Sequence, residues 1–548
     1  MADVAMHSIG TPYKRFRGDE RFDAIVIGSG IGGLGTAALL AKSGHRRVLV
    51  LEQHYAAGGL THSFRRPGFE WDVGLHYVGQ VHDPHSPARR LFDYLTEGRL
   101  DWKAMPNAYD RVRIGDLRFD YIRGQDALRD SLVGSFPRER RAIDRYFAAV
   151  ARCLGRLPLF FVEKILPPIP ARAIGGAMRL PFLLLARKTT ADVLDDIGMS
   201  VELKAVLTAQ WGDYGLPPRQ SSFAAHAMIT SHYFDGAAYP IGGSEQIAAA
   251  LMPVIARAGG SLLVGARVER VLVEAGRAVG VRMTDGREFR SACIVSDAGI
   301  RTTYEQLLPD AASEVAEQTV AVRALRASLG HVCLYVGLES AQPLPVGSAN
   351  IWVHPSVDYD GNLDRFVADA NAPFPFLFIS CPSAKDPSFA SRHSGGHTLE
   401  ILTMAPYEHF AEWSSTRWHH RGEEYESVKA RLARRMLDAL DQHVPGLSPS
   451  IRTWELSTPL STEHFTGAHR GAAYGLAHGP QRFACRYLRP RTPIDGLYLT
   501  GQDVATCGIM GALTGAVTAA STILRRNLFT LLQNATHTIE PARERRAA

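Results

Sequence analysis

The segment that most constrains this chain is residues 23–52, which read DAIVIGSGIGGLGTAALLAKSGHRRVLVLE. The apolar run at 24–27 has the length and the β-branched content of a buried parallel strand. Residues 34–41 predict a helix, and the apolar run at 48–51 predicts a second strand that ends at the acidic Glu52. A strand, a glycine turn, a helix and a second strand in this order are typical of a dinucleotide-binding unit.

Three glycines of this segment, Gly28, Gly30 and Gly33, have the spacing G-x-G-x-x-G. The first permits the tight turn after the strand, the second lets the backbone approach a pyrophosphate, and the third lets helix and strand pack closely. The helix then offers free N–H groups and the positive end of its dipole to the phosphates. Glu52 comes 19 residues after Gly33, where it can accept hydrogen bonds from ribose hydroxyls. A Gly-rich turn without a ligand is the alternative, but the flanking strands and the acid favour an adenine dinucleotide.

Two other parts of the chain carry related signals. Residues 496–503 predict a strand, a glycine turn and an acid, followed by an uncharged stretch at 504–524 that is rich in small residues and reads as a buried helix. Residues 81–239 have a helical tendency, and 300–489 mix helices with strands such as 332–338 and 377–380. Residues 240–299 predict a helix at 246–258, strands at 262–264, 266–273, 279–283 and 293–295, and a hairpin turn at Asp285 and Gly286.

This distribution predicts an α/β fold with two lobes. At 548 residues the chain exceeds what one compact core holds. The first lobe is a Rossmann-like dinucleotide-binding lobe, discontinuous in sequence, and the second is an α+β substrate lobe formed by two long insertions. The boundaries that we expect are 1–21 for a polar arm, 22–80 with 240–300 and 490–527 for the dinucleotide-binding domain, 81–239 with 301–489 for the substrate domain, and 528–548 for a tail.

Composition narrows the setting and the partners. The six cysteines are scattered, with no C-x-x-C pair and no histidine cluster at ligand spacing, which favours reduced thiols in the cytoplasm and no metal site. The N-terminal residues contain no apolar run typical of a secretory signal. The formal net charge of +6 is modest and no reader motif accompanies it, so we expect no nucleic-acid partner.

The basic charge is concentrated in one apolar region. Residues 138–188 contain eleven Lys or Arg against three Asp or Glu, and the segment 155–188 carries three apolar runs, each interrupted by proline and too short to span a bilayer. Basic residues beside exposed apolar ones are typical of a segment that lies in an anionic membrane interface. The alternative is a helical segment whose apolar side is core. We expect a cytoplasmic protein with peripheral membrane contact through 155–188.

The C-terminal element favours FAD over NAD. Gly501 and Asp503 follow a strand, and Asp503 is placed to bond the ribityl chain or the pyrophosphate of a large flavin cofactor, although an N-cap would also use such an acid. The positive end of the following helix would face the flavin N1/O2 edge and favour the anionic reduced ring. Val268, in a predicted strand, can supply the backbone contact to adenine.

Several motifs carry a resemblance to a known family. GSGIGGL, VLEQHYAAGG and DVGLHYVG resemble the FAD-dependent phytoene desaturase, carotenoid isomerase and retinol saturase superfamily. The more particular QWGDYGLPP at 210–218, with LTGQDV at 499–504, is most similar to its retinol saturase branch. The resemblance spans most of 22–525. It implies that the discontinuous lobe is a Rossmann-like FAD-binding lobe of the two-dinucleotide-binding-domain flavoprotein type, with 22–80, 240–300 and 490–527 as the FAD-binding domain. It implies FAD bound by Gly28, Ser29, Gly30, Gly32, Gly33, Glu52, Gln53, Gly59, Leu60, Val268, Gly501, Asp503 and Met510.

One position departs from the superfamily pattern. Many members carry Arg directly after the second glycine of the E-x₅-G-G element, where it reaches the pyrophosphate, and here that position is Leu60. The charge partner of the phosphates is therefore open, and His62 or backbone amides can take its place. Retinol saturases resemble this chain in lacking that arginine.

The resemblance implies chemistry on a conjugated isoprenoid polyene, most of all the saturation of a C=C bond in a retinoid or carotenoid. Saturation needs hydride from flavin N5 and a proton from a positioned acid, with the bond held against the ring. For the acid we expect His76 or Tyr77, with His226, His232 and Tyr239 as alternatives; each of these can equally be structural. An apolar tunnel is expected to use Trp211, Tyr214, Phe223 and Tyr239.

Three alternatives stay open. A carotenoid desaturase or a cis–trans isomerase would present the same flavin face to a longer polyene. A flavin-free isoprenoid-binding escort module shares the architecture, although the complete set of glycines and acids disfavours it. An amine oxidase shares the FAD signals but not QWGDYGLPP. The sequence contains no second G-x-G-x-x-G, which a separate NAD(P)H-binding unit would carry. The electron donor of the flavin is therefore unknown.

Overall fold

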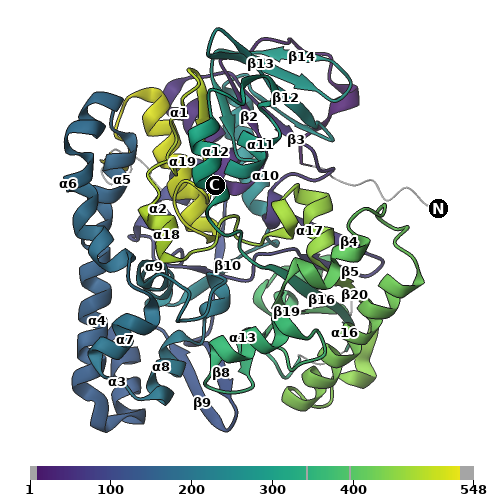
Figure 1. The fold of residues 1–548 in the computed structure, drawn as a ribbon. Helices are drawn as coiled ribbons and strands as arrows, with labels where there is room; N and C mark the ends of the chain where they lie inside the picture. Colours follow the sequence, from purple (N-terminus) through teal and green to yellow (C-terminus); the bar gives the residue numbers. More distant parts are fainter. Residues whose placement is uncertain (1–8, 341–343, 394–395, 531–548) are drawn as a thin grey trace, which may run out of the picture.

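The computed structural model describes residues 9–340, 344–393 and 396–530 (Figure 1). One part of it is built on a six-stranded sheet in the order β1-β11-β3-β2-β15-β21, in which every neighbouring pair is parallel. Every residue of β2, Ala24–Ile27, is buried, as expected of a parallel strand covered on both faces. The other strands are β1 Thr11–Pro12, β11 Ser261–Val264, β3 Val48–Glu52, β15 Ile294–Ser296 and β21 Leu497–Leu499.

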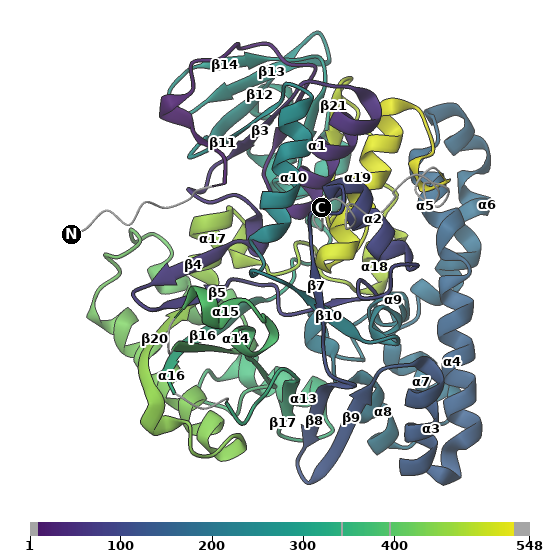
Figure 2. The same cartoon turned by 180° about the vertical axis from the view of Figure 1, so that it is seen from behind.

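Different layers cover the two faces of this sheet. Helices α1 (Ile31–Gly44), α10 (Gln246–Arg257) and α19 (Gly508–Leu524) pack on one face, as Figure 2 shows from behind. The antiparallel strands β12 (Val268–Glu274), β13 (Arg277–Met283) and β14 (Glu288–Arg290) lie on the other, with α11 (Ile300–Glu305) and α12 (Ala316–Arg323). The prediction of a Rossmann-like α/β lobe is confirmed, as are its strands at 24–27, 48–51, 262–264 and 293–295 to within a residue or two.

The two ends of the chain meet inside this lobe. A Cβ atom on Gly32, near the start of α1, would lie 2.4 Å from the Cα of Gly501, which follows β21. One turn later, a Cβ on Gly35 would lie 2.8 Å from Leu513 of α19. The backbones therefore approach so closely that only glycine fits at these positions. The uncharged stretch near the C-terminus is a helix buried against α1, as predicted.

The remaining part is built on a seven-stranded sheet in the order β20-β16-β19-β18-β17-β8-β9. Only the β17–β8 pair is parallel. Helix α16 (Glu423–His443) covers one face, where Leu432, Met436 and Leu440 are buried. The strands are β20 Ile451–Ser457, β16 Gly330–Glu339, β19 Gly396–Ala405, β18 Leu377–Ser380, β17 Asn350–His354, β8 Ala108–Ile114 and β9 Leu117–Ile122.

Helices α3 to α9 form a column along one side of the molecule (Figure 1). Their bounds are α3 Gln125–Ser135, α4 Arg140–Leu154, α5 Leu157–Ile165, α6 Pro168–Ala186, α7 Thr190–Ile197, α8 Val201–Thr208 and α9 Phe223–Tyr233. The shorter elements are β4 Ser63–Arg66, β5 Phe69–Asp72, β6 Val78–Gly79, β7 Trp102–Ala104, β10 Ala237–Pro240, α2 Pro87–Thr96, α13 Tyr359–Ala368, α14 Pro382–Lys385, α15 Phe389–Arg392, α17 Pro459–Thr466 and α18 Pro480–Ala484.

Two expectations need correction. The region 81–239 is not helical throughout, because the hairpin β8–β9 extends the seven-stranded sheet. Its buried Phe119 and Tyr121 alternate with exposed Arg118 and Asp120, a period of two that distinguishes a strand from a helix. The prolines also do not break every apolar run. Helix α6 continues through Pro181 for 19 residues and, among the described residues, is the one helix long and apolar enough to cross a membrane, on length and composition alone.

The chain termini lie partly outside the described residues. Of the predicted arm, residues 1–8 are not described, and β1 forms the edge strand of the parallel sheet beside β11. Of the predicted tail, 531–548 are not described, and Leu528 is fully buried against the helices of that sheet.

Candidate cofactor and substrate site

A cavity of about 570 Å³ lies at the carboxyl ends of the parallel strands. Its size is typical of a pocket for a cofactor or a small molecule, and its place is where open α/β sheets bind ligands. Four predicted cofactor residues do not line it: Ser29 and Gly501 lie in loops, Gly33 lies in the first turn of α1, and Met510 packs among the helices. The predicted cofactor residues that line it are Gly28, Gly30, Gly32, Glu52, Gln53, Gly59, Leu60, Val268 and Asp503.

Glu52 ends β3 and is held by the glycine turn. Its Oε2 accepts hydrogen bonds from the backbone N–H of Ser29 at 2.9 Å and from the Ser29 hydroxyl at 2.6 Å, and its Oε1 accepts one from the N–H of His54 at 2.8 Å. Burial raises the pKa of this carboxyl, and the three donors oppose that rise. The side chain is thereby fixed at the cavity wall, with its acid group where a ribose would lie.

The second glycine pair completes this wall. The N–H of Gly58 donates to the Ser29 hydroxyl oxygen at 3.0 Å, which joins the loop after β3 to the loop after β2. Gly58 and Gly59 have φ of 115° and 57°, which favour glycine, and a Cβ on Gly59 would lie 3.0 Å from the Cα of Gly30. A side chain at either loop would therefore enter the cavity or separate the two loops.

Sequence reasoning missed the acid at the phosphate end of this cavity. Asp297 follows β15, lines the cavity, and accepts a hydrogen bond from the N–H of Gly33 at the start of α1, at 2.8 Å. Burial, with the nearby charges of Glu52 and Asp503, raises its pKa to about 7. The carboxyl occupies the anion position that a helix N-terminus offers. Its place between the G-x-G-x-x-G turn and Gly501 is set by the parallel pairing of β15 with β2 and β21, which no local pattern reveals.

The carboxyl of Asp503 is held by hydrogen bonds from two backbone N–H groups. Its Oδ2 accepts from the N–H of Ile300 at 3.0 Å, at the start of α11, and its Oδ1 accepts from the N–H of Leu476 at 3.1 Å. Arg482 lies 3.6 Å away. Part of its side chain still lines the cavity. The acid thus joins the loop before α19 to two distant segments, and it acts as an N-terminal cap of α11 as well as a cavity residue.

The positive charges at the cavity come from arginines. Leu60 lines the wall without charge. The Nδ1–H of His62 donates to the carbonyl oxygen of Gly59 at 2.6 Å, and burial lowers the pKa of His62 and keeps its ring neutral. Arg267 and Arg301 also line the cavity. These two guanidinium groups, together with the backbone amides, are therefore available to balance a diphosphate, and the neutral His62 is not.

His76 and Tyr77, the expected proton donors, do not line this cavity. Burial lowers the pKa of His76 to about 3, so its ring is neutral; Nδ1 lies 2.9 Å from the Glu400 carboxyl, without the alignment of a hydrogen bond. Tyr77 donates through its hydroxyl toward two carboxyl groups, Asp110 at 3.0 Å and Asp213 at 2.9 Å.

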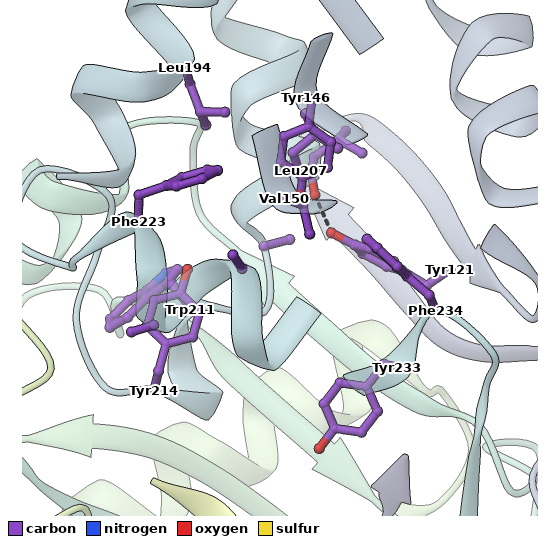
Figure 3. Close-up of a cluster of buried hydrophobic side chains, with 14 of the residues drawn as sticks. Tyr121, Tyr146, Val150, Leu194, Leu207, Trp211, Tyr214, Phe223, Tyr233 and Phe234 are labelled. Carbon is purple, nitrogen blue, oxygen red and sulfur yellow. Dashed lines mark hydrogen bonds between the residues drawn. The ribbon is translucent and has the colours of Figure 1, made fainter. Parts of the chain in front are cut away.

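The expected substrate residues are part of a compact core. Trp211, Tyr214 and Phe223 are buried among the helices of the column, as Figure 3 shows, and none lines the described cavity. Tyr239 lies on β10 and donates to the buried carboxyl of Asp72. His226 bonds the hydroxyls of Tyr146 and Tyr214, at 2.9 Å and 3.1 Å, and burial lowers its pKa to about 3.

The motif QWGDYGLPP nevertheless abuts the cavity. Its Gly212 has no room for a Cβ, which would lie 2.8 Å from Trp352, and its Gly215 adopts φ of 78° beside Tyr474. Tyr474 lines the cavity and donates through its hydroxyl to the carbonyl of Gly212 at 3.0 Å. Sequence reasoning did not assign a role to Tyr474. Through it, the motif forms the layer directly behind the cavity wall.

This arrangement fits a dinucleotide. The acid at the end of β3, the glycine loops without side chains, and two arginines match the ribose and the diphosphate of such a cofactor. The cavity continues to Gly508 and Ile509 at the N-terminus of α19, where the positive end of the helix dipole favours partial negative charge on a ring.

Known proteins are similar to this chain in sequence and in fold. A family model described as an NAD(P)-binding Rossmann-like domain matches residues 26–95. The prolycopene isomerase of Arabidopsis thaliana chloroplasts is 26% identical over 89% of this chain and 80% of that protein. A solved structure of putrescine oxidase bound to putrescine has a TM-score of 0.59 at 16% identity, over 92% of this chain and 99% of the other, which shows a shared fold. The all-trans-retinol 13,14-reductase of Danio rerio is 37% identical over 93% of this chain and 87% of its own length, and this chain therefore belongs to the all-trans-retinol 13,14-reductase family.

Proposed function

We propose that this protein is an FAD-dependent oxidoreductase that saturates a C=C bond of retinol or a related conjugated polyene. The family supports this reaction, because its relatives are named for reducing retinol or isomerising prolycopene. The observation that carries the proposal is the single cavity wall formed by both ends of the chain, with Glu52 at one end and the N-terminus of α19 at the other. NAD needs no such C-terminal helix, whereas a flavin ring would use it.

In this proposal each part of the wall has a role. Glu52 would accept from the adenosine ribose, the amides of the Gly28–Gly33 turn would hold the diphosphate, and Gly501 with Asp503 would face the ribityl chain. Backbone groups of Val268 would contact adenine. Bound there, the flavin would supply hydride to the polyene. The residues 22–80, 240–300 and 490–527 would then form the FAD-binding domain, and 81–239 with 301–489 the substrate domain.

The test separates saturation from its alternatives. Purified protein is loaded with FAD, the flavin is reduced chemically under anaerobic conditions, and retinol or a carotene is added. Mass analysis of the extracted polyene is expected to show a gain of two hydrogens. In a parallel incubation with oxidised flavin, which can accept two electrons, a loss of two hydrogens would instead assign a desaturase. Unchanged mass with a new isomer would assign a cis–trans isomerase. Recovery of the unchanged polyene isomer from flavin-loaded protein would contradict the proposal.

A membrane surface is the proposed source of such an apolar substrate. Helices α5 and α6 expose Leu159, Ile169, Ile174, Leu180 and Leu184, each at least half exposed. Arg172 lies on α6, and Arg187 and Lys188 directly follow the end of α6. All three are exposed. Leucines and isoleucines beside cations are suited to anionic lipid, where the apolar tips insert and the charges meet headgroups. We place the protein in the cytoplasm with this face on the membrane; its electron donor is not assigned.

A further inference from the structure

Three groups beside the cofactor cavity share one hydroxyl proton. The Tyr77 hydroxyl lies 3.0 Å from Oδ2 of Asp110 and 2.9 Å from Oδ2 of Asp213. A phenol carries a single proton and can donate it to only one acceptor at a time. If both carboxyl groups were ionised, one of them would face the phenol oxygen across 3 Å without a hydrogen. One carboxyl must therefore be protonated and donate to the Tyr77 oxygen.

The hydrogen-bond partners decide which carboxyl holds the proton. Asp110 accepts three further bonds, from Asn350 at 2.8 Å, Gln210 at 2.6 Å and Trp352 at 3.2 Å. Four donors stabilise an ionised carboxylate even when it is buried. Asp213 has Tyr77 as its only side-chain partner among the described residues. It has no other donor to stabilise a negative charge.

The charges around the pair agree with this assignment. Burial raises the pKa of both carboxyls, but the nearby charge of Asp110 raises that of Asp213 further, well above its usual value. The ammonium group of Lys385 bonds Oδ1 of Asn350 at 2.5 Å, on the far side of the amide that donates to Asp110. The positive charge of Lys385 thus lies one side chain away from Asp110, whereas among the described residues no lysine or arginine acts on the Asp213 carboxyl.

Asp213 also lies next to the segment that leads into α19 and the cavity. It belongs to the short 3₁₀ helix Trp211–Asp213 and keeps part of its surface accessible, whereas Trp211, Gly212 and Tyr214 beside it are buried. Its backbone carbonyl accepts from the thiol of Cys507 at 3.7 Å, and the next residue, Gly508, begins α19 and lines the cavity. The backbone of Asp213 therefore lies against the residues that begin α19, next to the end of the cavity where the proposed flavin ring would lie.

We propose that Asp213 is the protonated acid that supplies the proton in polyene saturation, with Tyr77 and Asp110 as its relay. This rests on the proposed function. One carbon of the double bond would receive hydride from the reduced flavin, and its neighbour would receive the proton of the Asp213 carboxyl. The C=C bond would become a CH–CH bond, and reduced flavin, when bound, would supply the two electrons of this reduction. Asp213, left as a carboxylate, then accepts the Tyr77 hydroxyl bond until solvent returns a proton.

Tyr77 can stabilise the negative charge that Asp213 would carry after it gives up its proton. Its hydroxyl can turn from Asp110 to Asp213 when Asp213 loses its proton, because Asp110 keeps three other donors. The Tyr77 hydroxyl can thus donate to the newly ionised carboxyl of Asp213. His76 cannot act as a cationic acid, because its ring is neutral, and it lies against Glu400 instead. Tyr77, an expected donor, becomes a positioning residue for the acid.

Infrared spectroscopy tests the protonation without substrate or turnover. The C=O stretch of a protonated carboxyl shifts in D₂O, and the difference spectrum between wild type and Asp213→Asn is expected to contain one such band at neutral pH. Asp130→Asn, whose side chain is 72% exposed, is expected to remove none. Tyr77→Phe should move the Asp213 band but keep it, which holds the test open if Asp213→Asn folds poorly. Loss of the band in Asp110→Asn, with no loss in Asp213→Asn, would overturn the assignment.

Turnover then tests the role. Chemically reduced, FAD-loaded Asp213→Asn is expected to saturate retinol at least about 100-fold more slowly than wild type, the usual contribution of a general acid. Its flavin absorbance should be unchanged, Asp213→Glu should restore part of the rate, and Asp130→Asn should match wild type. Equal rates for Asp213→Asn and wild type would refute the acid. If wild type converts no polyene, the proposed function fails, and the infrared result still decides where the proton lies.

Discussion

At the residue scale, the shape of the cavity depends on glycines, which have no side chain to fill it. Gly30, Gly32 and Gly501 surround the carboxyl of Asp297 so closely that a Cβ on any of them would lie 2.1–2.6 Å from one of its oxygens. A negative carboxyl in an anion site is unusual, because a diphosphate and an ionised aspartate repel each other. The protonation of this one residue should therefore control cofactor binding.

The first prediction concerns the pH dependence of FAD affinity. The pKa of Asp297 is about 7 in the protein without cofactor, and bound diphosphate would raise it further. Below pH 7 the carboxyl is already neutral; above it, binding must take up a proton, so the dissociation constant should rise by up to about tenfold per pH unit. Titration followed by flavin fluorescence at several pH values measures this slope.

The variant Asp297→Asn isolates that effect. It keeps the size of the side chain and removes its titration, so FAD should bind more tightly above pH 7 and with little pH dependence. Other titratable groups at the wall remain: the acids Glu52, Glu269 and Asp503, the histidines His54, His62 and His469, Tyr474, and the arginines Arg267 and Arg301. A slope in Asp297→Asn equal to that of wild type would assign the effect to one of these and contradict the prediction.

Glu52, the acid of the glycine motif, could be predicted from sequence because its hydrogen-bond partners are close in sequence. The pairing of Asp110 and Asp213 at Tyr77 could not be predicted. Glu52 lies 23 residues from Ser29, within one strand–helix–strand unit. Tyr77, Asp110 and Asp213 come from three segments, and they meet only when β8 joins β17 and the motif at 210–218 packs behind the cavity. A pattern in a single sequence contains no signal for such a meeting.

At the element scale, the packing of α1 on α19 determines whether the cavity forms. The second prediction is that Gly32→Ala lowers the melting temperature and abolishes flavin binding, because the new methyl group would lie 2.4 Å from the Cα of Gly501. Gly134→Ala in α3 is the matched control, since a Cβ there meets nothing within 4 Å. It should raise stability slightly, by about 0.5–1 kcal/mol. Thermal unfolding and bound flavin are measured on both variants.

The third prediction concerns the exposed face of α6. Leu180 and Leu184 are 52% and 59% exposed and lie one turn apart, so Leu180→Glu with Leu184→Glu should leave the fold intact and weaken binding to anionic liposomes by about tenfold or more. Leu183 is unsuitable, because it is 8% exposed and belongs to the core. Co-sedimentation with phosphatidylserine vesicles provides the measurement.

The control for that prediction replaces exposed apolar residues elsewhere. Val320 on α12 and Val367 on α13 are 69% and 43% exposed. Val320→Glu with Val367→Glu adds the same charge to other surfaces and should sediment as wild type does. If both double variants lose binding equally, net charge alone explains the attraction, and no specific face is required.

Element prediction succeeded where the periodicity was strong and failed where it was short. The strand at Ala24–Ile27 and the strand Leu377–Ser380 were predicted to the residue, because each is a continuous apolar run between breakers. The hairpin Ala108–Ile114 and Leu117–Ile122 was missed within a helical region, since its alternation of charged and apolar residues lasts only a few positions. Pro181 was expected to end an apolar run and instead lies within α6.

At the scale of the whole molecule, the fold brings the first and last parts of the chain to one cavity. The two-lobe α/β class follows from chain length and from signals at both ends, whereas the strand order β20-β16-β19-β18-β17-β8-β9 does not. Segments more than 200 residues apart pair in that sheet, such as Asp110 with Asn350. Long-range pairing is decided by the packing of whole faces, which local patterns do not describe.

The central claim is that one cofactor spans from the glycine turn after β2 to the N-terminus of α19. The most direct measurement is the identity and amount of cofactor released from purified, FAD-reconstituted protein after denaturation. The account predicts close to one FAD per chain, a flavin absorbance near ~450 nm in the intact protein, and loss of both in Gly32→Ala but not in Gly134→Ala. Folded wild-type protein that retains no flavin, or that binds NAD in its place, would contradict it.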